Sequence, residues 1–244
     1  MQDQFFLVLV RLRLALDTED LADRFGVSPN TVSRIFITWI NLMYHNFSEL
    51  PTWMSRKKVD KLMPQSFRSW CPSTRIIIDG SQFFIERPSS LARQSATWSN
   101  YKNHNTLKAL VGISPDGTIT FISHLFEGSI SDVNLVAQSG LLQFLERGDS
   151  VMADKGFDIQ HLLSGIGVRL NIPPFRRGEQ QFTPDEILKT KKIAAVQIHV
   201  ERAINRIKGF KILRGVMPNT LWNTAEQIVH VAAHLTIFQP AFVA

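Results

Sequence analysis

The chain has 244 residues, of which 44% are hydrophobic, and its 27 Lys and Arg exceed its 21 Asp and Glu, giving a formal net charge of +6. This length and composition allow one large domain or a medium domain with a small one, and they exclude a disordered or low-complexity chain. The single cysteine, Cys71, excludes an internal disulfide framework and a cysteine-based zinc site. A basic globular chain favours nucleic acid as its partner. The apolar run at 5–10 is too short to cross a membrane and predicts a helix core, so no membrane partner is expected.

Residues 1–48 predict a small all-α helix-turn-helix domain. Ala22 is small where two helices would cross, and Gly26 can end the first helix in the left-handed conformation. Ser28 is a candidate N-cap of the second helix, with Pro29 at its first position. The outer face of this helix is expected to contact DNA through Asn30, Thr31, Ser33 and Arg34. A small helical bundle without DNA contact is the alternative.

Residues 49–74 predict a connecting segment, because prolines recur there beside a basic cluster at 56–58. We expect one short helix in it, with Trp53 and Trp70 packing onto the domain that follows.

The remaining residues, 75–244, predict an α/β domain. Runs rich in β-branched and aromatic residues indicate strands at 75–79 (with a continuation or bend into 83–85), 107–113, 118–126, 150–153 and 168–172. Ser114-Pro115-Asp116-Gly117 predicts a hairpin turn, and the polar, aromatic segment 88–105 predicts a long loop. Helices are expected at 131–146, around 158–163 and from the capping box that starts at Thr183. This order predicts a mixed five-stranded sheet of the ribonuclease H type with helices on both faces, in which the first and fourth strands are neighbours.

Three carboxylates suggest a metal site in this domain. Asp79 and Asp154 each end an apolar strand, and Glu201 lies in the long helix. If the two strands are neighbours, these oxygen ligands would suit Mg²⁺ or Mn²⁺, in a site for two divalent ions. Taken singly, each residue also has a structural interpretation, as a turn residue or a solvated helix residue. Asp132 could compete with Asp154 for the second ligand position. We favour Asp154, because Asp132 is expected in the first turn of a helix, as an accessory group that orients a metal-bound water.

Basic and aromatic side chains around these carboxylates suggest DNA contacts. The candidates for phosphate contacts are Lys155, Arg202, Arg206 and Lys208, although a solvated or ion-paired charge is the alternative for each. Trp98 and Tyr101 either stack on an unpaired base or anchor their loop. His230 and His234 have the spacing of a zinc pair, but their apolar helix favours hydrogen-bonded structural histidines.

These motifs together resemble the Harbinger-type transposases of the DDE superfamily of endonucleases, which eukaryotic DNA transposons encode. The matching stretches run nearly from end to end and include 21–39, 79–88, 94–113, Asp154-Lys155-Gly156-Phe157 and His199-Val200-Glu201-Arg202-Ala203. Gln82 departs from the family, whose members often carry Glu there.

The resemblance implies that Asp79, Asp154 and Glu201 are the catalytic DDE triad and bind two divalent ions. It further implies a nuclear protein that acts on double-stranded DNA at transposon ends and target sites, with a Myb-like partner protein and self-association. A domesticated transposase that binds DNA without transposition activity is the alternative, which the intact triad disfavours.

Overall fold

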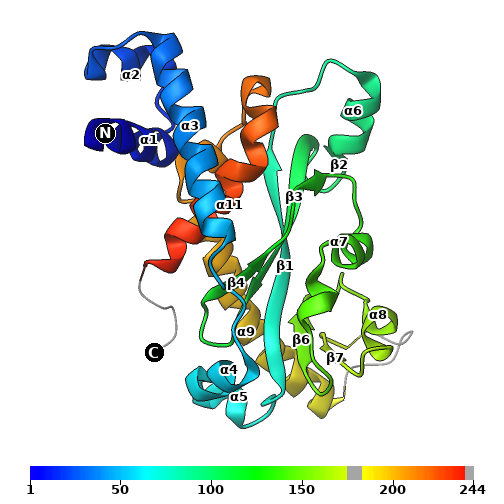
Figure 1. The fold of residues 1–244 in the computed structure, drawn as a ribbon. Coiled ribbons are helices and arrows are strands. Elements are labelled where there is room, and N and C mark those ends of the chain that lie inside the picture. Colours follow the sequence, from blue (N-terminus) through cyan, green and yellow to red (C-terminus); the bar gives the residue numbers. More distant parts are fainter. Residues whose placement is uncertain (175–182, 240–244) are drawn as a thin grey trace.

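The computed structural model describes residues 1–174 and 183–239. Its first three helices are α1 (Gln2–Leu14), α2 (Thr18–Phe25) and α3 (Pro29–Ser48), and they form the projecting N-terminal part of the molecule (Figure 1). Gly26 ends α2 with a φ of 63°, and the Ser28 side chain accepts a hydrogen bond of 3.2 Å from the backbone N–H of Thr31. The predicted helix-turn-helix and its caps are therefore confirmed.

The connecting segment contains two short helices instead of the one expected, α4 (Arg56–Leu62) and α5 (Gln65–Arg68). Pro64 is the reason, because it lacks the N–H that would continue α4 and instead sits at the N-cap of α5. Trp53 packs onto the following domain as predicted, with its ring 5.3 Å from that of Phe144 and 5.2 Å from the guanidinium carbon of Arg75.

A mixed, seven-stranded sheet organises the rest of the chain, with the strand order β2-β3-β1-β6-β7 and with β4 and β5 both paired to β3. Its strands are β1 (Thr74–Phe84), β2 (Trp98–Ser99), β3 (His104–Ile113), β4 (Ile119–Ile122), β5 (Phe126–Glu127), β6 (Ser150–Ala153) and β7 (Arg169–Asn171). The strand β6 corresponds to the fourth predicted strand and lies parallel to β1, next to it. The predicted neighbours are confirmed, within an α/β fold of the ribonuclease H type.

Three predicted elements differ in detail. The expected loop 88–105 contains β2 and a helix, α6 (Leu91–Thr97), which the side chain of Asn105 holds by donating to the Gln94 carbonyl at 2.8 Å. The strand expected at 118–126 is split into β4 and β5, because at Ser123 a hydroxyl accepts the Leu110 N–H in place of a backbone carbonyl. The helix expected at 131–146 breaks at Gly140, whose φ is 81°, into α7 (Asp132–Gln138) and a 3₁₀ turn, η1 (Leu141–Phe144).

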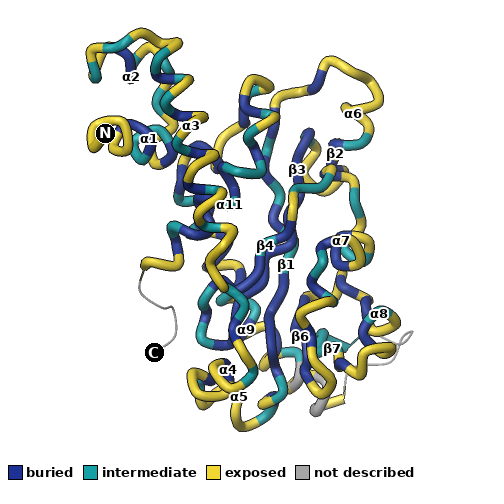
Figure 2. Tube along the Cα trace, in the orientation of Figure 1, coloured by how far each residue is buried: buried dark blue, intermediate teal, exposed yellow. Residues whose placement is uncertain are grey.

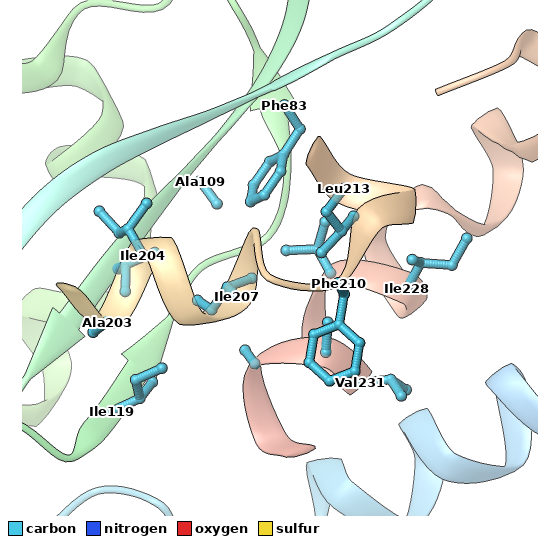
Figure 3. Packing of buried hydrophobic residues seen from close by; sticks show 14 of the residues in the cluster. Phe83, Ala109, Ile119, Ala203, Ile204, Ile207, Phe210, Leu213, Ile228 and Val231 are labelled. Carbon is cyan, nitrogen blue, oxygen red and sulfur yellow. The ribbon is translucent and has the colours of Figure 1, made fainter. Parts of the chain in front are cut away.

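The helices cover both faces of the sheet. On one face, Ile76 and Ile78 pack with residues of α7 and α8 (Gln160–Ser164), whereas Ile77 faces the opposite core. That core contains α9 (Pro184–Ile207) and α11 (Ala225–Ile237), with α10 (Lys211–Arg214) and the 3₁₀ turn η2 (Asn219–Thr224) between them. Figure 2 shows the central strands as the most continuously buried part of the chain. In Figure 3, side chains of α9 such as Ile204 and Ile207 lie among those of the sheet and α11.

The same core continues into the N-terminal helices, because Leu7 of α1 and Phe36 of α3 belong to one buried cluster with Ile228 of α11. The α3 and α11 helices also share ring contacts: Tyr44 meets His230 edge-on at 5.4 Å, and Phe47 stacks on His234 at 5.5 Å. Among the described residues, no helix has the length and apolarity to cross a membrane.

Candidate active site

Asp79 and Asp154 lie where the pairing between β1 and β6 ends. In the parallel register, Ile78 of β1 is opposite Ala153, the last residue of β6. Asp79 and Asp154 directly follow this pair, so the two aspartates lie next to each other where the pairing between β1 and β6 ends. Asp79 does not end its strand, however, because β1 continues to Phe84 through pairing with β3. This corrects the expectation of a strand that ends at Asp79.

Glu201 completes the group from the helix α9. A pocket of about 130 Å³ is lined by Asp79, Asp154 and Glu201 together with Ile78, Gln197 and Val200. Val200 is buried against the sheet while Glu201 is exposed, so the packing of the apolar side of α9 turns Glu201 toward the ends of the strands. The three carboxylates that the sequence singles out are brought together in one pocket.

The carboxylates repel one another. Burial, with smaller contributions from the negative charges of Asp132, Asp154 and Glu201, raises the pKa of Asp79 to about 6. The backbone N–H of Gly80, 2.7 Å from Asp79 Oδ1, opposes the shift without cancelling it. A bound cation would reverse this balance by favouring the ionised form of Asp79.

Asp132 lies at the edge of this group and is tied to a buried lysine. It begins α7, and its Oδ1 is 2.7 Å from Nζ of Lys108, which also donates to the Ile130 carbonyl at 3.2 Å. The loop after β6 passes close to the Asp132 carboxylate at Gly156, which has no side chain. Any larger residue there would bring its Cβ to 2.9 Å from Asp132 Oδ2. Among the three carboxylates, Asp132 has a larger effect on the pKa of Asp79 than Asp154 has. Sequence reasoning missed Lys108, which lies in an otherwise apolar strand.

The donor set fits hard divalent cations in its chemistry. Carboxylate oxygens are the ligands that Mg²⁺ and Mn²⁺ prefer, and after burial the charges of three neighbouring carboxylates contribute to the raised pKa of Asp79. Within residues 1–174 and 183–239, no three acidic, histidine or cysteine side chains converge closely enough to bind one ion. Two of the carboxylates are instead held by local hydrogen bonds. Asp79 accepts the backbone N–H of Gly80 at 2.7 Å, and Asp154 accepts the backbone N–H of Lys155 at 2.6 Å. The site therefore has suitable ligands in an open arrangement.

Lysines flank the pocket. Lys208 follows α9, with its Nζ 5.6 Å from the ring centre of Phe83. Burial and the positive charge of Lys102 lower the pKa of Lys208, and the charge of Asp79 partly offsets this. Lys208 is thus within electrostatic reach of both Lys102 and Asp79. Lys155 is exposed directly after Asp154.

Arg202 and Arg206 lie on a different side of α9 from Glu201. They line a surface pocket of about 350 Å³ with Asn205, Gly209 and Arg13 of α1. Arg13 donates a hydrogen bond of 2.9 Å to the Gly209 carbonyl. The N-terminal helices and α9 therefore share a basic surface.

The four candidate DNA-contacting residues of α3 differ in exposure. Asn30 and Arg34 are exposed, whereas Thr31 is half-buried with its hydroxyl 2.9 Å from that of Ser28. Ser33 lines a cleft of about 620 Å³ between α3 and the α10–η2 region, which also contains Arg11 and Lys211. Ser33 thus faces another part of the protein.

The remaining candidates are placed as follows. The His230 ring is 3.1 Å from the Ser123 carbonyl, and burial lowers the pKa of His230 to about 4. The His234 ring forms a hydrogen bond of 2.7 Å with the His230 carbonyl. Both histidines are therefore hydrogen-bonded structural residues. Tyr101 is 83% and Trp98 42% exposed, so Tyr101 in particular is free of core packing.

Comparison with known families agrees with this arrangement. Residues 78–236 match the model of the family described as DDE superfamily endonuclease, and residues 1–49 match the helix-turn-helix of DDE superfamily endonuclease. The first match covers more than half of the chain and includes all three pocket carboxylates. The chain belongs to the DDE superfamily endonucleases, with the helix-turn-helix of that superfamily at its N-terminus. No curated protein matches the chain.

Proposed function

We propose that this protein is a Harbinger-type transposase that cuts DNA phosphodiester bonds and joins strands with two Mg²⁺ or Mn²⁺ ions. The observation that carries the proposal is the single pocket shared by Asp79, Asp154 and Glu201, in that order along a chain of this family. These three residues would hold the ions. When bound, divalent ions neutralise the charge that develops on the phosphate and lower the pKa of water, which makes it a nucleophile.

The protein's own residues supply the rest of the reaction site. Asp79 must be ionised to act as a ligand, and Lys208 places positive charge near it, where the DNA backbone would lie. A DNA 3′-hydroxyl that takes the place of water at the same site turns cleavage into strand transfer. The exposed Tyr101 ring, next to Lys102 Nζ at 4.5 Å, offers a stacking surface for an unpaired base near the cut.

Binding to double-stranded DNA is divided between two surfaces in this proposal. The helix-turn-helix (residues 1–48) follows the groove through α3, and the connecting segment (49–74) joins it to the endonuclease domain (75–244). Arg34 and Asn30 are exposed at the N-terminal end of α3 and suit base contacts. Arg202 and Arg206, with Arg13, suit the flanking phosphates. The resemblance to Harbinger transposases further supports a nuclear location, self-association and a Myb-like partner protein.

Incubation of the purified protein with supercoiled plasmid, with and without Mn²⁺, tests this function. Asp79→Ala, Asp154→Ala and Glu201→Ala should each abolish metal-dependent nicking and leave DNA binding largely intact, because each removes an ion ligand and no phosphate contact. Asp158→Ala, which removes an exposed carboxylate four residues after Asp154, is the matched control and should nick normally.

Each outcome of this experiment has a definite meaning. Near-normal nicking by one triad variant would remove that residue from the site. A wild-type protein that binds DNA and never cuts it would support the alternative, a domesticated DNA-binding protein.

A further inference from the structure

Gln197 lines the same pocket as the three carboxylates and has a buried donor with no partner. It lies one helical turn before Glu201 on α9. Its side-chain Nε2 is inaccessible to solvent and makes no hydrogen bond with any described residue. Buried donors in folded proteins are nearly always satisfied, so one left unpaired in a functional pocket indicates a ligand atom that completes it.

The surroundings of Gln197 define that ligand atom. Ile78 and Val200 line the pocket with apolar side chains that accept nothing, and none of the three carboxylates accepts from Gln197. An amide N–H needs an oxygen acceptor. The substrate of this pocket offers one in the non-bridging oxygens of the phosphodiester, which carry its negative charge.

Chain geometry places Gln197 where such a phosphate would pass. Residues 197, 201 and 208 are four and seven positions apart, which puts them along one side of a helix. Gln197 and Lys208 therefore flank Glu201, one turn before it and two turns after it. A neutral amide can bind the phosphate without forming an ion pair with the carboxylates that the metal ions require.

We propose that the Gln197 amide donates a hydrogen bond to a non-bridging oxygen of the scissile phosphodiester. This inference rests on the proposed nuclease function and adds to the three ion-binding carboxylates of the pocket an uncharged residue that contacts the scissile phosphate. Loss of a hydrogen bond to a charged oxygen should slow cleavage by about 10- to 100-fold.

The test uses Gln197→Met, which keeps the length of the side chain and removes the donor. Once the wild-type nick is mapped, single-turnover cleavage is measured on oligonucleotide duplexes with a normal phosphate or with one of the two phosphorothioate diastereomers at that bond. The variant should be about 10- to 100-fold slower on the normal phosphate. Its defect should largely vanish for the diastereomer whose sulfur replaces the bonded oxygen and persist for the other. Gln197→Glu, which replaces the donor with a negative charge, should be slower than Gln197→Met.

Gln227→Met is the matched control, because Gln227 also has an unpaired buried side-chain atom but lies on α11, outside this pocket. It should cut at the wild-type rate with both diastereomers. Equal rates for Gln197→Met and wild type, or the same defect with all three substrates, would overturn the inference while the triad variants still test the nuclease function. If the wild type fails to cut, affinity for an unmodified DNA duplex in Ca²⁺ decides, and equal binding by Gln197→Met and Gln227→Met overturns the inference.

Discussion

Replacing Asp79 with Asn should stabilise the metal-free protein at neutral pH while it disables the proposed active site. The Asp79 carboxylate is mostly buried, and three further carboxylates act on it. The substitution removes this unfavourable charge and keeps a side-chain oxygen that can accept the Gly80 N–H. A site built to hold cations is expected to be destabilising in their absence.

The size of the effect follows from the pKa of Asp79, which is raised from 3.8 to about 6. Each pKa unit corresponds to about 1.4 kcal/mol, so the ionised carboxylate destabilises the folded state by up to about 3 kcal/mol. Between these two pKa values the folded protein keeps a proton that the unfolded chain has lost, so stability falls as pH rises. The destabilisation by the ionised Asp79 carboxylate is absent well below pH 3.8 and complete well above about pH 6.

Urea unfolding in EDTA, at about pH 4.5 and about pH 7.5, measures this difference for wild type, Asp79→Asn and the surface control Asp158→Asn. The gain in the free energy of unfolding from Asp79→Asn should be small at the acidic pH and reach about 1–3 kcal/mol at the higher one. Added Mg²⁺ should stabilise the wild type more than Asp79→Asn. A gain that is equal at both pH values, or a loss at the higher pH, would refute the electrostatic argument.

Two further predictions concern recognition and the second aspartate. Arg34→Ala should weaken DNA binding by about 1–3 kcal/mol in a mobility-shift titration if the exposed guanidinium contacts a base, and changes at the exposed Asn30 should alter sequence preference. Ser33 faces the α10–η2 region, so a change there should leave sequence preference unaltered. Unchanged affinity after joint replacement of Asn30, Thr31, Ser33 and Arg34 would make the module purely structural. Asp132→Asn should reduce nicking only in part, because Asp132 is paired with Lys108, whereas Asp154→Asn should eliminate it. Complete loss of nicking in Asp132→Asn would assign the second ligand position to Asp132.

Local signals were sufficient for much of this fold. The turn of the helix-turn-helix follows from Gly26, Ser28 and Pro29, whose local hydrogen bonds reach no further than four positions along the chain. The neighbouring positions of β1 and β6 follow from the element order, and this brings Asp79 and Asp154 together.

Features that depend on distant partners were not predictable. In the helix α6 only Thr97 is fully buried, and the helix is held by the Asn105 side chain from β3. Lys108 resembles a solvent-facing residue until Asp132, 24 positions later, is placed beside it. Ser33 has the sequence position of a base contact, but the packing of the N-terminal helices turns it toward the α10–η2 region.

The hydrophobic core that joins α1 and α3 to α11 has a consequence for the DNA. Phe36 of the helix-turn-helix and Ile207 of the helix that carries Glu201 belong to the same buried cluster, so α3 and the carboxylate pocket keep a set separation. Under the proposed function, this set separation would fix the number of base pairs between the sequence that α3 reads and the bond that is cut. If base pairs are inserted between the recognised sequence and the original cut site, the nick should stay at the same distance from the recognised sequence and move off the original cut site.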